Sequence, residues 1–335
     1  MIALLAAALL QAPAPSTAPA ATPFFDSDSV MAVTIRTDLR TLLRDRDPNV
    51  DVWREGSIVW SAGDSTRAAR VRLRTRGLYR LRECDFPPIR LRFAQEESRG
   101  TPWENLRRPK LVTHCMNNAE YEQNLLQEYA IYRVLRLLTP LSFTARLVRV
   151  TWEDSLGNVR PVTRYGIVTE DPERFAERVG GALVPDSGVT FAMLNPANIA
   201  LVGVFQYFIA NTDWSVPGRH NIELLRTSDG LHAIPYDFDW AGVINARYAR
   251  PAAILPIRSV RERIFRGYCR SGTALEPVLA RFESLRDSIA AVYRSVPDLD
   301  PRIVERTLRY HDEFFRTISD RERFTRRVVA PDCLG

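Results

Sequence analysis

The chain has 335 residues, 45% of them hydrophobic, and carries a net charge of +6, which fits one large or two smaller globular domains. Lys110 is its only lysine, a pattern typical of an arginine-rich genome. The arginines from Arg70 to Arg76 alternate along a strand-like run, so they indicate a solvated strand face and no nucleic-acid interface. The net positive charge also suits binding of phosphate-bearing ligands or anionic lipid headgroups.

Residues 1–22 have the composition of a secretory signal peptide. The apolar run 2–10 is too short to span a bilayer, and an Ala-Pro-Ala pattern at 18–20 offers a cleavage site. No later segment is apolar for long enough to cross a membrane, so we expect an exported protein, periplasmic or extracellular.

Four cysteines suit an oxidising compartment and allow three pairings. Proximity in sequence favours Cys84–Cys115 and Cys269–Cys333, and four buried thiols are the alternative. The cysteine and histidine spacings do not form a zinc motif.

Residues 23–170 are predicted to be mainly β. Expected strands cover 31–36, 57–62, 69–76, 89–93, 111–113, 143–152 and 159–168, with a short helix at 39–46. The segment 76–80 contains a single glycine and is either an ordinary turn or a phosphate cradle.

A helix is predicted from Asn118 to Leu138, where proline and glycine are absent. Glu128 falls within its apolar stripe, and a buried carboxylate needs a partner. Lys110 on the preceding strand is one candidate, and solvent or an arginine is the alternative.

Residues 171–335 are predicted to be mostly helical, with helices at 171–180, 196–210, 259–268, 273–294 and 301–318. Asn195 and Pro196 begin an apolar helix that belongs in a core. The segment 211–240 follows it: a polar loop, then a strand, a Ser-Asp-Gly turn and a second strand that ends in two aspartates.

The polar loop carries Asp213, His220 and Asn221, and the hairpin returns Asp237 and Asp239 to the same neighbourhood. Carboxylate and amide oxygens are the ligands of a hard divalent cation and its phosphate partner. Capped turns, salt bridges with arginine or a loop hydrogen bond of His220 are the structural alternatives.

The order of elements is that of protein kinases: a strand with a lysine, a helix with a glutamate, a hairpin, a helical region, and then Asp, Asn and Asp. The segments NTDWSVPGRHN (211–221) and IPYDFD (234–239) resemble the CotH family of secreted and spore-coat kinases and, more distantly, HipA-type kinases. They also resemble a group of exported bacterial proteins without an assigned activity. The resemblance implies an α+β, protein-kinase-like two-lobed fold with a β-rich N-lobe at 23–170 and a mostly helical C-lobe at 171–335.

The resemblance also implies roles for the residues that match its motifs. Asp213 would be the catalytic aspartate, while Asn221, Asp237 and Asp239 would hold Mg²⁺ or Mn²⁺. The cofactor-binding residues would be Lys110 on the phosphates of ATP, Glu128 orienting that lysine, and Glu170 near the adenine. Asp213 and Asn221 are further apart than in the motif H-R-D-x-x-x-x-N, and a glycine-rich loop is absent.

The resemblance implies transfer of phosphoryl from a magnesium nucleotide to a protein Ser/Thr or small-molecule hydroxyl. The alternative is an inactive member of the same fold that acts as a binding or scaffolding module of the cell envelope. The sequence contains no GxSxG elbow, dinucleotide fingerprint or Walker A loop. A glycosidase that uses two of the aspartates remains open, because the sequence does not set their separation.

Overall fold

Alternating apolar and polar residues build strands in the first half of the chain. The computed structural model describes residues 22–49, 51–185, 188–268 and 275–332. Seven strands precede residue 170: β1 (Met31–Thr37), β2 (Arg54–Ala62), β3 (Ser65–Thr75), β4 (Ile89–Phe93), β5 (Lys110–Val112), β6 (Ala145–Asp154) and β7 (Val162–Thr169). Each overlaps a strand that the alternation predicts.

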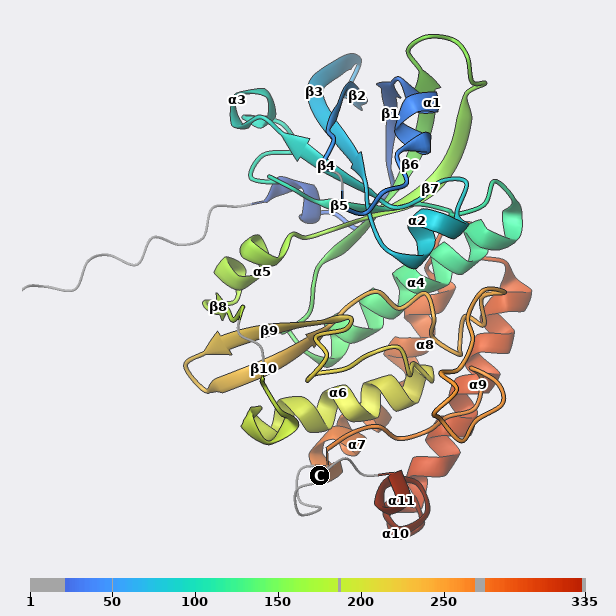
Figure 1. Ribbon diagram of the computed structural model, residues 1–335. Coiled ribbons are helices and arrows are strands. Elements are labelled where there is room, and N and C mark those ends of the chain that lie inside the picture. The colour runs from blue at the N-terminus through green and yellow to red at the C-terminus, as the bar shows by residue number, and fades with distance from the viewer. Residues whose placement is uncertain (1–21, 50, 186–187, 269–274, 333–335) are drawn as a thin grey trace, which may run out of the picture.

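These strands form a closed barrel in the order β1-β2-β3-β4-β5-β7-β6 (Figure 1). β1 closes it by pairing parallel to β6, with Met31 opposite Val148, whereas the other neighbours are antiparallel. Apolar side chains such as Leu73, Leu91 and Leu111 fill the interior. The arginines of β3 and β4 alternate with them and therefore lie on the outer face.

The predicted protein-kinase-like two-lobed fold is wrong. A closed seven-stranded barrel of mixed pairing, accompanied by helices and a C-terminal helical region, replaces the expected lobes. The reason lies in the partner of β1, because a two-residue period identifies a strand and its buried face but not the strand that it pairs with.

Three short helices connect the barrel strands: α1 (Leu39–Arg44), α2 (Tyr79–Glu83) and α3 (Gln95–Ser98). A single turn of 3-10 helix, η1 (Pro23–Phe25), precedes β1. The segment 76–80 therefore leads into α2, and Gly77 adopts a φ of 101° that suits glycine.

Helix α4 (Ala119–Leu138) begins at Asn118, whose side chain caps it by accepting from the backbone N–H of Tyr121. It packs against β6 and β7 on one side and against α8 on the other. Burial from both sides explains why Glu128 is only 1% exposed.

The second half contains a small sheet and most of the helices. The strands β8 (Ala182–Leu183), β9 (Ile222–Thr227) and β10 (Gly230–Pro235) form a sheet in the order β10-β9-β8. The helices are α5 (Pro172–Arg178), η2 (Phe191–Met193), α6 (Pro196–Ile209), α7 (Leu275–Ser284), α8 (Arg286–Arg294), α9 (Pro301–Ser319), α10 (Arg321–Phe324), a π-helical turn η4 (Thr325–Val329) and α11 (Ala330–Asp332).

Helix α6 is the buried rod that its sequence predicts. Asn195 caps it, Pro196 is its first residue, and the side chains from Asn198 to Ile209 are all buried. It ends at Ala210, which adopts the left-handed conformation with a φ of 52°.

The predicted helix at 259–268 does not form, and the one at 273–294 is divided. Residues 259–268 make turns, because the side chains of Arg263 and Arg266 donate to the backbone carbonyls of Tyr310 and Trp214 and so fix an irregular path. Residues 275–294 form α7 and α8, with Leu285 between them, and residues 269–274 lie outside the described residues.

Cys84 and Cys115 form a disulfide, as predicted from their proximity in sequence. Cys269 and Cys333, the other expected pair, lie outside the described residues, as do residues 1–21 of the expected signal peptide. Within the described residues, no helix is both long and apolar enough to cross a membrane.

Candidate functional site

A crevice lies between the outer face of the barrel, helix α4 and the turn that follows β10. We call it the Lys110 crevice, and in this structure its volume is about 10 Å³, which is room for about one water molecule. Its lining residues are Arg76, Lys110, Val112, Tyr132, Phe143, Thr169, Glu170, Tyr236 and Asp237. The lining thus combines two cations, two carboxylates and three aromatic rings.

Lys110 enters the crevice because it is the first residue of β5 and points out of the barrel, opposite to Leu111. Its ammonium lies 4.2 Å from the centre of the Tyr236 ring, a cation–π contact. Burial and, to a lesser extent, the nearby guanidinium of Arg76 together lower the pKa of Lys110 to about 7.

Asp237 lies just past the end of β10 in the left-handed conformation, with a φ of 61°. Its backbone N–H donates to the hydroxyl of Tyr132 at 3.0 Å. Burial by itself raises the pKa of the Asp237 carboxyl, but the guanidinium groups of Arg80 and Arg76 outweigh burial and hold that pKa below its ordinary value. Asp237 is therefore ionised at neutral pH.

A buried ionic cluster adjoins Asp237. Arg80 lies 3.7 Å from the Glu128 carboxylate and 3.6 Å from that of Asp239, and the hydroxyl of Tyr248 donates to Asp239 at 2.8 Å. Burial raises the pKa of Glu128 and of Asp239. Neighbouring carboxyl groups raise both further, and Arg80 offsets part of the effect.

This cluster identifies the partner of Glu128 as an arginine, the alternative that the sequence left open. Glu128 is paired with Arg80 and not with Lys110, because α2 inserts Arg80 against α4. Arg76 and Arg80 are the site residues that sequence reasoning missed, and both lie in the segment 76–80, for which the sequence predicts either a turn or a phosphate cradle.

Asp213 and Asn221 contact each other directly. The side-chain amide of Asn221 donates to the Asp213 carboxylate at 2.9 Å and to its backbone carbonyl at 2.8 Å. Nε2 of His220 lies 2.8 Å from the other carboxylate oxygen of Asp213. The loop that carries Asp213 is held by Arg266, which donates to the carbonyls of Thr212 and Trp214.

The β9–β10 hairpin brings this loop to the crevice. Ile222 lies opposite Pro235 in the ladder, and the backbone N–H of Tyr236 donates to the carbonyl of Asn221 at 3.1 Å. Asn221, with a φ of 53°, and Asp237 are both left-handed. Strained residues of this kind cost roughly 1–3 kcal/mol each and cluster at functional sites, so this end of the hairpin is a candidate site.

Glu170 lines the crevice but already has a partner. Its carboxylate accepts from Arg178 at 3.0 Å and from the backbone N–H of Thr144 at 3.2 Å. Both contacts hold Glu170 at the end of β7 next to Lys110, which lies opposite Thr169 in the ladder.

The donor set for a cation is small. The ionised Asp237 carboxylate and the amide oxygen of Asn221 fit Mg²⁺, which binds oxygen ligands. Asp239 is occupied by Arg80 and Tyr248. Among the described residues, no group of three or more His, Cys, Asp or Glu side chains is arranged to hold a metal. Mg²⁺ commonly takes only one or two carboxylates and completes its shell with water and substrate phosphates.

The predicted site residues thus fall into three places: Lys110, Glu170 and Asp237 line the crevice, Asp213 and Asn221 adjoin it through the hairpin, and Glu128 and Asp239 lie in the Arg80 cluster. Searches with the sequence found no matching family model and no matching curated protein.

Proposed function

We propose that the chain is a phosphotransferase: the walls of the Lys110 crevice separate to admit the phosphates of a magnesium nucleotide, whose terminal phosphoryl group is transferred to a hydroxyl. One observation carries the proposal: the cations Lys110 and Arg76 and the ionised Asp237 line the same crevice. The phosphate groups of a nucleotide require positive charge, and the metal ion bound to them requires a carboxylate. The partly exposed ring of Tyr236 offers an apolar surface for a nucleobase.

Each residue has a role that its surroundings support. Lys110 and Arg76 bind phosphate oxygens, and binding of an anion returns the Lys110 amine to its charged form. Asp237 and Asn221 would hold Mg²⁺, which, when bound, neutralises charge on the transferring group. Glu170 keeps the crevice wall in place through Arg178.

Asp213 is the proposed general base. His220 and Asn221 fix its orientation. The Asp213 side chain is 30% exposed to solvent, so an acceptor hydroxyl can approach it. In the transfer, a bond forms from the acceptor oxygen to the terminal phosphorus while the bond to the bridging oxygen breaks. The proton of the acceptor passes to the Asp213 carboxylate.

The test separates binding from transfer. Incubation with terminally radiolabelled ATP and Mg²⁺ or Mn²⁺ is expected to label the protein itself or a generic hydroxyl substrate. The variant Asp213→Asn keeps the nucleotide contacts but removes the base, so it is expected to bind nucleotide and transfer roughly a hundredfold more slowly. Equal labelling by the wild type and Asp213→Asn contradicts the role of Asp213.

A second candidate function is nucleotide binding without transfer, as a scaffolding module of the cell envelope. The observation that favours it is the full engagement of Asp213, both of whose carboxylate oxygens already have hydrogen-bond partners. Nucleotide affinity in the wild type without label transfer under any metal supports this second function.

The Cys84–Cys115 disulfide favours an oxidising compartment, so we infer that the protein works outside the cytoplasm, where its nucleotide and acceptor would meet it. Fractionation of cells that express the full chain tests this inference.

A further inference from the structure

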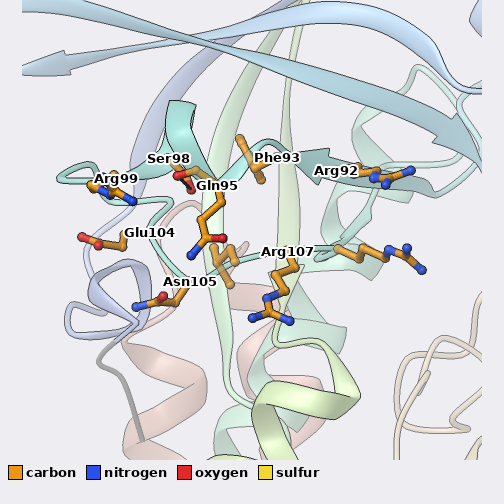
Figure 2. Close-up of a pocket in the computed structure, with 10 residues that line it drawn as sticks. Arg92, Phe93, Gln95, Ser98, Arg99, Glu104, Asn105 and Arg107 are labelled. Carbon is orange, nitrogen blue, oxygen red and sulfur yellow. Dashed lines mark hydrogen bonds between the residues drawn. The ribbon is translucent and has the colours of Figure 1, made fainter.

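The outer face of the barrel carries a second basic surface beside the crevice. Two adjoining hollows between β3, β4, α3 and residues 99–108 share Arg92, Phe93 and Gln95, and Figure 2 draws the residues that line one of them. Six arginines line them: Arg70, Arg72, Arg92, Arg99, Arg107 and Arg108. We call this surface the arginine groove. Figure 2 shows Gln95 between Arg107 and the side of the hollow that carries Arg99 and Glu104.

Like charges face each other across the strands of this surface. The ladders place Arg72 opposite Arg92, Arg74 opposite Arg90, and Arg90 opposite Lys110. Like charges directly opposite each other destabilise a sheet. Only the first of these pairs lies within the groove, where an anionic ligand would offset the repulsion.

The carboxylates of the chain neutralise only part of the groove. Glu97 pairs with Arg70 at 2.5 Å and Glu55 pairs with Arg72 at 2.8 Å. In the described part of the chain, no carboxylate lies within ion-pair distance of the other four groove arginines, which are Arg92, Arg99, Arg107 and Arg108. These four side chains are exposed and can receive a ligand.

The groove is continuous with the crevice. Residues 107–109 run beside β4, because Phe93 and Leu91 donate to the carbonyls of Arg107 and Pro109, and β5 then begins at Lys110. Arg90 lies at the junction, and its buried Nε has no hydrogen-bond partner. Burial lowers the pKa of Arg90, and the neighbouring guanidinium groups, Arg76 of the crevice among them, lower it further.

The spacing of the charges indicates the shape of the ligand. Arginines at alternate positions of β3 and β4 repeat every two residues, roughly 7 Å along a strand. An extended peptide presents alternate side chains at the same interval, and each carboxylate can accept two hydrogen bonds from a guanidinium. Among the described residues, Trp53 is the only ring that stacks on Arg74 and Arg92, whereas surfaces for single-stranded nucleic acid use several aromatic rings.

We propose that the arginine groove binds an extended acidic peptide segment, which docks the protein whose hydroxyl is presented to the Lys110 crevice. The docking role rests on the proposed function, whereas peptide binding itself does not.

Fluorescence anisotropy with a labelled peptide of alternating Glu and Ser tests the binding. The wild type is expected to bind it, and the double variant Arg107→Gln/Arg108→Gln is expected to bind at least roughly tenfold more weakly. The matched control Arg294→Gln/Arg302→Gln removes the same charge from exposed positions on α8 and α9, away from α3 (Figure 1), and is expected to bind within about twofold of the wild type.

Three results would overturn the proposal: absence of binding by the wild type, an equal loss in both double variants, or tighter binding of an oligonucleotide or polyphosphate of the same charge. Calorimetry with the magnesium nucleotide on the same proteins separates this proposal from the proposed function. Arg107→Gln/Arg108→Gln is expected to keep its nucleotide affinity, and Asp237→Asn is expected to keep its peptide affinity. A wild type that binds the peptide but not the magnesium nucleotide therefore refutes the proposed function alone.

Discussion

Lys110 is the only lysine of the chain, and it lies almost fully buried in the crevice with its ammonium over Tyr236. Burial and the nearby Arg76 bring its pKa to about 7, far below that of a lysine in water. The amine is therefore protonated and unreactive below that pH and becomes a neutral nucleophile above it. A buried amine poised in this way is suited to a ligand that restores its charge.

Reductive labelling with an aldehyde measures this pKa. The aldehyde condenses with the neutral amine, and borohydride reduces the imine, so labelling at Lys110 is expected to rise with a midpoint near pH 7. An ordinary lysine would show a midpoint near about 10. Peptide mapping separates Lys110 from the α-amino group, and Lys110→Arg is the control. Magnesium nucleotide is expected to protect Lys110, and a midpoint above about 9 would contradict its burial.

Asn221 combines left-handed backbone with two hydrogen bonds to Asp213. The variant Asn221→Ala loses both bonds and keeps the strain, so its free energy of unfolding is expected to fall by roughly 2–3 kcal/mol. Asn221→Gly loses the same bonds but relieves the strain, and its loss is expected to be smaller by about 1 kcal/mol. Urea denaturation measures both, and equal losses would show that strain contributes nothing there.

At the scale of elements, the end of α6 and the turn after β10 hold one another. The backbone N–H groups of Gly242 and Val243 donate to the carbonyls of Ala210 and Ile209. A Cβ added at Gly242 would lie 1.9 Å from the carbonyl oxygen of Val260. Glycine at this position therefore allows three segments to meet beside the segment that carries Asp237 and Asp239.

The variant Gly242→Ala tests this contact. Since backbone and not a flexible side chain blocks the new methyl group, the loss of unfolding free energy is expected to reach about 3 kcal/mol. Gly218→Ala is the matched control, because its nearest neighbour is the side chain of Ser215 at 3.0 Å, and it is expected to lose less than about 1 kcal/mol. Equal melting curves for the two variants would refute the argument.

The local sequence pattern was sufficient to predict most helices and strands, but not which of them pair or pack together. The strands of the barrel, α4 and α6 follow from periodicity and from caps such as Asn118 and Asn195. The parallel pairing of β1 with β6 does not, because it joins residues far apart in the chain. The same limit applies at the site, where the contact of Arg80 with Glu128 depends on how α2 packs against α4.

At the scale of the whole molecule, the Cys84–Cys115 bridge links the end of α2 to the segment between β5 and α4. The same two regions supply Arg80, Lys110 and Glu128, so the bridge supports the arrangement of the site. In the chain-entropy model, a loop of 31 residues contributes about 3–4 kcal/mol.

Removal of the bridge tests this contribution. The variant Cys84→Ala/Cys115→Ala is expected to lose about 3 kcal/mol of unfolding free energy and to respond less than the wild type to a reductant. Its labelling at Lys110 is expected to shift toward higher pH as the crevice loosens. A variant as stable as the wild type would show that packing alone holds α2.

Calorimetric titration with magnesium ATP tests the central claim, that the crevice binds a magnesium nucleotide, most directly. The wild type is expected to bind, and Asp237→Asn is expected to bind at least roughly tenfold more weakly, since asparagine keeps the left-handed backbone but loses the charge. Asp298→Asn, at another left-handed aspartate outside the crevice, is expected to match the wild type. Equal binding by all three proteins, or none by the wild type, would contradict the account.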